Sequence, residues 1–235
     1  MRTWIFAGIC DKSDLLMYLC KILIQSGKRV LLIDAAHAGK YTHCIRRLDD
    51  SMLITEFAGF DVGIGFKQFS DVLVHIKAAG ESDYDYILID AEQESFLTID
   101  DWSAADAKIW VSSFEVAGLM KSASWLDGLS ENYGEQERPA FHRIYLNVIE
   151  DFTDDEYIES FLGSSRVQWL DDPVRIPWDE ITFALKIENE HMGRLRIKPL
   201  PKRYKKALVD LVQRLTEMEN RQIRRSFRQA ERRMA

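Results

Sequence analysis

The sequence has 235 residues and a formal net charge of −7, with 46% hydrophobic and 29% charged residues. This composition is ordinary for a soluble globular protein, and the length allows one well-buried domain with a short appendage. No apolar run reaches the roughly 18 residues of a membrane-spanning helix, and the first apolar run is too short for a secretory signal. We therefore expect a cytoplasmic protein, and the acidic balance argues against a general nucleic-acid-binding surface.

The chain contains three cysteines, Cys10, Cys20 and Cys44, and five histidines. The cysteines form no C-x-x-C motif, so we expect buried free thiols rather than disulfides or zinc ligands. The histidines are scattered, and none pairs with another at the spacing of a helical zinc site. We therefore assign no metal site to these residues.

The first 34 residues show a strand, a helix and a second strand in succession. Residues 3–7 are an apolar run of strand length, and residues 30–33 are a second run that ends in Asp34. Between them, leucines recur at helical spacing up to Ser26 and Gly27, and a glycine in that position commonly ends a helix. Apolar runs that are continuous rather than alternating indicate strands covered by helices on both faces.

The same strand pattern returns later, and each run ends in polar residues. The runs are residues 86–89 before Asp90, residues 109–111 before two serines, and residues 144–146 before Asn147. Helices are predicted near residues 67–80, 116–132 and 154–162. This alternation predicts an α/β fold with a doubly wound, mostly parallel sheet that helices cover on both faces. Because ligands bind at the carboxyl ends of such strands, the candidate site residues are 7–13, Asp34, Asp90 and Asn147.

Residues 49–66 contain Gly59, Gly63 and Gly65 among apolar residues. The Gly-x-Gly spacing lacks the third glycine and the following helix of a dinucleotide-binding loop. We predict a loop packed against the sheet.

Residues 7–14 read Ala-Gly-Ile-Cys-Asp-Lys-Ser-Asp. They resemble the P-loop of the MinD/ParA family of ATPases (SIMIBI class), which runs Lys-Gly-Gly-x-Gly-Lys-Thr-Thr. In this register Gly8 is a loop glycine, Lys12 matches the phosphate-binding lysine and Ser13 matches the magnesium-binding hydroxyl.

Further segments resemble this family in the same order along residues 1–215. They are the second strand at 27–34, the Walker B strand Tyr-Asp-Tyr-Ile-Leu-Ile-Asp at 84–90, the Ala-Asp strand at 105–111, the Ile-Tyr-Leu-Asn strand at 144–147, the Ile-Pro-x-Asp turn at 176–179 and the last helix at 204–208. The resemblance implies a P-loop NTPase-like fold, a homodimer, and binding of ATP and Mg. The implied nucleotide-binding residues are Gly8, Lys12, Ser13, Asp34, Asp90, Asn147 and Pro177, with Ser13 and Asp90 at the metal.

Three residues depart from the family pattern where its chemistry is concentrated. Ala7 replaces the signature lysine that reaches across a dimer, Asp11 replaces the glycine before the P-loop lysine, and Ala36 replaces the second aspartate of Asp-x-Asp. At about 4 Å and an effective dielectric of about 20, the Asp11 carboxylate repels one phosphate charge by about 4 kcal/mol. Because phosphoryl transfer depends on positioning and charge stabilisation, we expect little or no ATP hydrolysis and weak or absent nucleotide binding.

Simpler roles for these residues remain open. Lys12 is also typical of a surface lysine in a first helical turn, and Ser13 or Asp11 of a helix N-cap. Asp34 and Asp90 are also typical of strand-end caps, and Asn147 is a common turn residue.

The tail differs in charge from the rest of the chain. Residues 213–235 contain seven arginines and three glutamates, a charge of +4, which leaves −11 for residues 1–212. Apolar residues from Ile223 to Met234 share one helical stripe, so we predict a domain of residues 1–215 followed by a basic amphipathic helix at 216–235. Three roles remain: weak membrane contact, as in MinD proteins, docking of a partner, or packing on its own domain. The residues assigned to a membrane or partner surface are Ile223, Arg224, Arg225, Phe227, Arg228 and Arg232.

The leading hypothesis is a degenerate MinD/ParA-like protein that acts as a localisation or assembly factor for a bacterial envelope machine. That machine is of the pilus, secretion or cell-division type, and the resemblance extends in style to the CpaE/TadZ pilus-assembly group. Such a protein self-associates and docks on a protein partner, in the cytoplasm or at the periphery of the inner membrane. The alternative is an active ATPase of positioning or DNA segregation, in which Lys12, Ser13, Asp34 and Asp90 suffice to bind Mg and ATP, although the acidic core argues against DNA.

Overall fold

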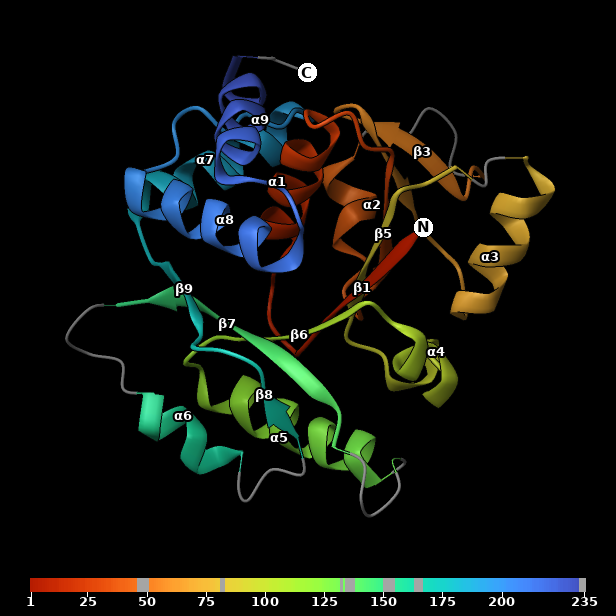
Figure 1. The fold of residues 1–235 in the computed structure, drawn as a ribbon, viewed down its shortest axis with the longest axis vertical. Helices are drawn as coiled ribbons and strands as arrows, with labels where there is room; N and C mark the ends of the chain where they lie inside the picture. The colour runs from red at the N-terminus through yellow and green to blue at the C-terminus, as the bar shows by residue number, and fades with distance from the viewer. Residues whose placement is uncertain are drawn as a thin grey trace.

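The computed structural model describes residues 1–45, 51–80, 83–131, 133, 138–149, 155–162 and 167–232. Within these residues the fold centres on a nine-stranded sheet in the order β3-β4-β2-β5-β1-β6-β7-β8, and β9 also pairs with β7. Figure 1 shows the sheet running through the middle of the molecule. The strands are β1 (Arg2–Ala7), β2 (Val30–Ala35), β3 (Ile54–Phe57), β4 (Phe60–Gly63), β5 (Tyr86–Ala91), β6 (Ala107–Ser112), β7 (Ala140–Val148), β8 (Gln168–Trp169) and β9 (Val174–Pro177).

The sheet is mostly parallel, as predicted. β1 lies between β5 and β6, and β2 lies between β4 and β5, all in parallel pairs. Among the described strands, β3 is antiparallel, and it pairs with β4 at the edge. Every residue of β2 and β5 is buried, which explains why each strand is continuously apolar up to the aspartate near its end.

Helices cover both faces of the sheet and give a three-layer molecule. Figure 1 shows α1, α7, α8 and α9 on one side, and α4, α5 and α6 on the other. The helices are α1 (Ser13–Ile24), α2 (Lys40–Cys44), α3 (Phe69–Ala78), α4 (Ile99–Ala104), α5 (Val116–Glu131), α6 (Asp155–Phe161), α7 (Glu180–Met192), α8 (Lys202–Leu215) and α9 (Asn220–Arg232), with a 3-10 turn η1 (Glu94–Phe96). Two buried clusters, one on each face, make up the core.

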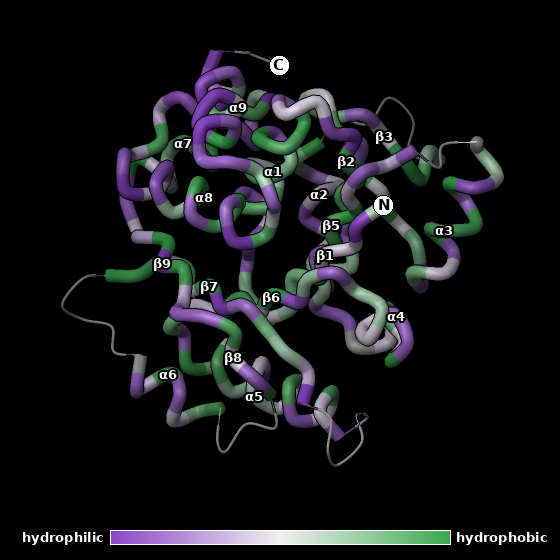
Figure 2. Tube along the Cα trace, in the orientation of Figure 1, coloured by the Kyte–Doolittle hydropathy of each residue, from purple (hydrophilic) through white to green (hydrophobic). Residues whose placement is uncertain are grey.

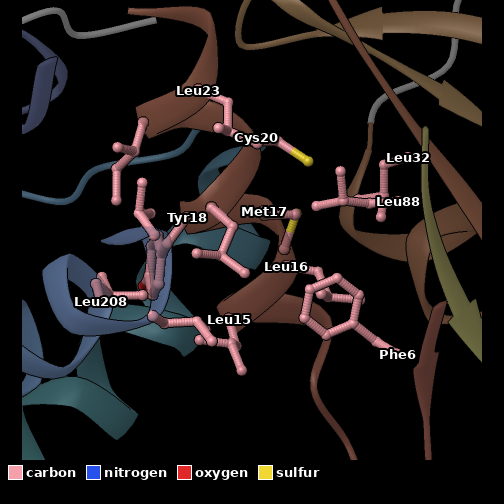
Figure 3. Packing of buried hydrophobic residues seen from close by; sticks show 14 of the residues in the cluster. Phe6, Leu15, Leu16, Met17, Tyr18, Cys20, Leu23, Leu32, Leu88 and Leu208 are labelled. Carbon is pink, nitrogen blue, oxygen red and sulfur yellow. The ribbon is translucent and has the colours of Figure 1, made fainter. Parts of the chain in front are cut away.

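Helix α1 follows the loop of the candidate site and is almost entirely buried. Its residues Leu16 and Tyr18 are fully buried, and they pack in one cluster with Phe6 of β1, Leu32 of β2 and Leu208 of α8. Figure 3 shows these side chains filling the space around α1. Burial of each such side chain contributes about 2 kcal/mol, so the start of α1 is held firmly against the carboxyl ends of the strands.

The prediction of a loop at residues 49–66 is wrong for the residues that the structure describes, 51–66. β3 and β4 form a hairpin whose turn is Ala58-Gly59. Both turn residues have positive φ, 52° and 93°, as expected for a two-residue hairpin turn whose twist matches the strands. Alanine rarely adopts this conformation, so the turn carried no clear sequence signal. Residues 49 and 50 lie outside the described part of the chain.

Helix α9 packs on its own protein. Ile223, Phe227 and Ala230 are buried in the same cluster as α1 and α8, while Met234 lies outside the described residues. Figure 2 shows hydrophilic residues over much of the outer side of α8 and α9. The apolar stripe predicted to meet a membrane or partner is therefore already covered, and the exposed residues of α9 are mainly arginines. No helix among the described residues is long and apolar enough to cross a membrane.

Candidate functional site

The candidate site lies where β1, β2 and β5 end. In the register of the sheet, Asp34 of β2 stands beside Asp90 of β5, and Ala7 of β1 stands beside Ala91. The loop from β1 to α1, which contains Lys12, follows at the same edge. The structure thus brings the predicted residues from three separated segments together.

The loop backbone is pressed against β6 and α5. Gly8 has a φ of +132°, and a Cβ atom there would lie 2.0 Å from the Val111 carbonyl oxygen. The next amide, of Ile9, donates to the Ser122 hydroxyl at 3.1 Å, and Gly118 of α5 comes close to the Ile9 carbonyl. Only glycine fits at position 8, and one amide of the loop is bound to a side chain of the protein.

Lys12 is buried and points inward, so the alternative of a surface lysine is wrong. Its side chain is 0% exposed, and its Nζ lies 2.7 Å from Asp90 Oδ1 and 3.7 Å from Glu92 Oε1. The same ammonium donates to the Gly8 carbonyl at 2.7 Å. Burial lowers the pKa of Lys12, but the attraction of Asp90 and Glu92 raises it by more, so the pKa lies above its ordinary value. A charged lysine therefore sits in a ring of acceptors from the protein itself.

Asp90 is held on both carboxylate oxygens. Oδ1 forms an ion pair with the Lys12 ammonium, and Oδ2 accepts a hydrogen bond from the buried Tyr41 hydroxyl at 2.9 Å. Tyr41 comes from α2, an element that the sequence analysis did not predict. The aspartate assigned to magnesium thus has two partners within the protein.

Asp11 forms a second charged cluster with two lysines. Its Oδ2 pairs with Lys186 of α7 and with Lys40 of α2. Burial raises the pKa of Asp11, but these lysines lower it by more and hold it well below its ordinary range. The carboxylate predicted to repel a polyphosphate is therefore ionised and already neutralised by two cations.

Ser13 is bound to the same carboxylate. Its hydroxyl donates to Asp11 Oδ1 at 2.8 Å, and its backbone amide donates to that oxygen at 3.3 Å. Asp11, rather than Ser13, thus binds an amide at the start of α1. The hydroxyl matched to magnesium binding is engaged by the residue that replaces the family glycine.

Two residues that the sequence analysis did not single out, Glu92 and Gln93, join the loops after β2 and β5. Glu92 Oε2 accepts from the His37 amide at 3.0 Å, and Gln93 Nε2 donates to the Ala36 carbonyl at 3.1 Å. These bonds depend on the register between β2 and β5, which no local pattern reveals. They fix the segment around Ala36 to the Walker B-like strand.

Asp34 lies under this segment and is 7% exposed. Its Oδ1 accepts from the Ala36 amide at 3.1 Å, whereas the buried Oδ2 has no hydrogen-bond partner. Burial, reinforced by the charges of Asp90 and Glu92, raises the pKa of Asp34 to about 6. Asp34 therefore caps its own turn through one oxygen and leaves the other unsatisfied.

Asn147 and Pro177 lie beside the charged clusters rather than within them. Asn147 is exposed and has a φ of +57°, at an irregularity in the pairing of β7 with β9. Pro177 ends β9 and lines a groove against α8. Because β6 separates β7 from β1, neither residue contacts the loop through strand pairing.

The arrangement does not fit a bound nucleotide as it stands. Lys12, Ser13 and Asp90 each bind another group of the protein, and the two lysines on Asp11 are neutralised. Among the described residues, no group of three or more His, Cys, Asp or Glu side chains is arranged to hold a metal ion. A polyphosphate must displace these contacts before it can use these side chains.

The parallel sheet, its strand order and the loop between β1 and α1 define a P-loop NTPase-like fold. No protein-family model matches the sequence, and no curated protein matches it significantly.

Solved structures identify the particular fold as that of MinD/ParA ATPases. The MinC:MinD cell division protein complex of Aquifex aeolicus matches with a TM-score of 0.58 and 18% identity over 93% of this chain and 97% of that one. A ParA family ATPase from Chlorobium tepidum TLS matches with a TM-score of 0.56 and 18% identity over 92% and 99%. MinD complexed with Mg-ADP from Pyrococcus horikoshii OT3 matches with a TM-score of 0.56 and 16% identity over 92% and 99%. The predicted resemblance to MinD/ParA ATPases is thus confirmed for the fold.

Proposed function

We propose that this protein is a degenerate MinD/ParA-like localisation or assembly factor that works with little or no ATP hydrolysis. It acts in the cytoplasm, or at the periphery of the inner membrane, on a bacterial envelope machine of the pilus, secretion or cell-division type, in the style of the CpaE/TadZ group. It self-associates as a homodimer and docks on a protein partner. Neighbours of the same fold include a MinC:MinD cell division complex, which is consistent with a protein partner.

One observation supports the proposed lack of hydrolysis: the Lys12 ammonium and the Ser13 hydroxyl each bind a carboxylate of the protein. Lys12 pairs with Asp90 at 2.7 Å, and Ser13 donates to Asp11 at 2.8 Å. Hydrolysis requires a lysine and a hydroxyl that are aimed at phosphate and metal. Here both are satisfied without a ligand, and Ala7 and Ala36 supply no replacement for the missing lysine and aspartate.

An exposed apolar edge supports self-association. The carboxyl ends of β6, β7 and β9 lie side by side, and large apolar residues that follow them are about half exposed. These residues are Val116 (49%), Met120 (59%), Ile149 (51%), Trp178 (54%) and Ile181 (53%). Apolar side chains gathered at one edge are typical of a protein contact surface, and an isologous contact there gives a closed dimer.

The deciding experiment is a calorimetric titration of the protein with ATP and Mg, together with a steady-state hydrolysis assay. We expect no binding below millimolar nucleotide and no turnover. The Asp11→Gly variant tests the site further, because it removes one negative charge and frees Lys40 and Lys186. We expect it to gain nucleotide affinity by about tenfold or more, which corresponds to about 1.4 kcal/mol, without efficient hydrolysis.

Lys12→Ala in the Asp11→Gly background is the matched control: provided that circular dichroism shows it to be folded, it should abolish the gained affinity. Turnover by the unchanged protein would instead establish the alternative, an active ATPase that uses Lys12, Ser13, Asp34 and Asp90. Tight binding of ATP without turnover would agree with the lack of hydrolysis but contradict the expected lack of binding, and it would indicate a nucleotide-sensing switch.

A further inference from the structure

A groove runs between β9, α8 and the start of α9, away from the P-loop. It encloses about 960 Å³, which is enough for several side chains of a ligand. Its apolar lining includes Val174 and Pro177 of β9 and Ala207 and Val209 of α8. Ala207 and Val209 are partly buried and pack against the core, so the apolar part of the groove belongs to the rigid body of the protein.

Cations surround this apolar lining on all three elements. Arg175 comes from β9, Arg203 and Lys206 from α8, and Arg224 from α9, and all four are exposed. The lining also includes one carboxylate, Asp210, which pairs with Arg214 at 2.9 Å. The groove is therefore apolar at its base and cationic around its rim.

The uneven distribution of charge along the chain favours an acidic ligand at this groove. Residues 194–235 contain 14 Lys and Arg against four Asp and Glu, a charge of +10, which leaves −17 for residues 1–193. A surface of one sign raises the local concentration of oppositely charged partners and speeds their association. The surrounding acidic protein repels the same partners from other faces, which adds specificity.

The groove is formed before any ligand arrives. Ile223 and Phe227 anchor α9 in the core beside Arg224, and Leu208 anchors α8 beside Ala207. Binding therefore costs little ordering of the backbone.

We propose that this groove binds an acidic amphipathic segment of a partner protein, with the apolar side of the segment on Pro177, Ala207 and Val209 and its carboxylates at the rim. A phosphate backbone or a lipid headgroup can use the cations but leaves the apolar lining without a partner. An acidic helix with one apolar face satisfies both parts of the groove, as in other helix-in-groove complexes. Lys12, Ser13 and Asp90 do not line the groove, which shares only Pro177 with the residues implied to bind nucleotide.

The test uses three labelled synthetic peptides and the full chain, with fluorescence anisotropy at low and physiological salt. The first peptide is a helix with leucines along one face and glutamates on both flanks. The second has the same composition in shuffled order, and the third replaces the leucines by glutamines. We expect the first to bind about tenfold tighter than either control. Equal binding by the shuffled peptide, or no binding by any peptide, overturns the proposal.

Variants locate the site. Lys206→Glu with Arg224→Glu should weaken the first peptide by about tenfold or more, and Val209→Gln should weaken it without changing charge. Lys77→Glu with Lys121→Glu makes the same charge change at exposed positions on α3 and α5, and should have little effect. Circular dichroism and thermal melting confirm that each variant folds. If duplex DNA or phosphatidylglycerol vesicles bind more tightly than the first peptide, and the same rim variants remove that binding, the groove is a phosphate site and the proposal is wrong.

Discussion

Lys12 and Asp90 form a buried ion pair between the loop before α1 and the end of β5, with Nζ 2.7 Å from Oδ1. These two residues match the phosphate-binding lysine and the magnesium-binding aspartate of the MinD/ParA pattern. In this protein they pair with each other, while Tyr41 donates a hydrogen bond to Asp90 and Glu92 lies beside the Lys12 ammonium. A site that holds its own counter-charges can keep the geometry of a P-loop fold without a nucleotide.

The first prediction concerns this pair. Lys12→Met leaves the Asp90 carboxylate buried without its cation, so we expect the free energy of unfolding to fall by about 3–5 kcal/mol. Lys28→Met is the control, because Lys28 pairs with Asp85 at 2.9 Å on the surface and should cost less than about 1 kcal/mol. Urea unfolding measures both. Equal small losses would mean that the buried pair does not form in solution.

The second prediction concerns the start of the loop. Gly8→Ala places a Cβ atom 2.0 Å from the Val111 carbonyl oxygen at a φ of +132°, so β6 or the loop must move. We expect a loss of stability of at least about 3 kcal/mol. Gly80→Ala is the matched control, because Gly80 also has a positive φ, +70°, but nothing lies near its Cβ position. It should cost about 1 kcal/mol, and a similar cost at both positions would contradict the close approach.

The fold is predictable from the sequence because a local run of apolar residues marks each central strand. The runs at 30–33 and 86–89 are continuously apolar, and both become fully buried strands in the centre of the sheet. The hairpin was missed because its turn uses Ala58 with a positive φ. The apolar stripe of α9 was visible in the sequence, but nothing local shows that α1 and α8 cover it.

The chemistry of the site is less predictable, because it depends on distant residues. Asp11 was expected to repel phosphate, but its partner Lys186 lies 175 positions further along the chain. No sequence pattern singles out Glu92 and Gln93, because their contacts follow from the register of β2 with β5. A motif identifies positions, whereas the protonation and pairing of their side chains come from tertiary structure.

The third prediction concerns Asp34, whose pKa burial raises to about 6 from about 3.9 in the unfolded chain. The folded state therefore binds more protons between these values, and this residue makes stability fall as pH rises from about 4 to about 6. Asp34→Asn keeps an oxygen for the Ala36 amide and removes the buried charge. We expect it to stabilise the protein by about 1–2 kcal/mol at neutral pH and to flatten this part of the curve. Urea unfolding across this pH range measures the effect, and an unchanged pH profile would argue against a buried charge at Asp34.

The last prediction concerns Lys21 of α1, which is buried and donates to the Leu195 carbonyl. Burial lowers its pKa to about 8, whereas the unfolded chain titrates near 10.4. The unfolded state thus binds more protons between these values, so Lys21 makes the free energy of unfolding rise with pH across that window. Below about pH 8 the buried ammonium is fully charged and lowers stability by its full amount.

Lys21→Met removes the buried ammonium but keeps most of the side-chain volume. We expect a gain of about 1 kcal/mol at pH 7, because the lost hydrogen bond to Leu195 offsets part of the relief. The rise in stability above about pH 8 should also disappear. Urea unfolding between about pH 7 and about pH 10 measures both effects, with Lys77→Met, an exposed lysine of α3, as the control for loss of one charge. A destabilised Lys21→Met protein whose alkaline slope matches that of the unchanged chain would show that Lys21 is anchored by its hydrogen bond rather than strained by burial.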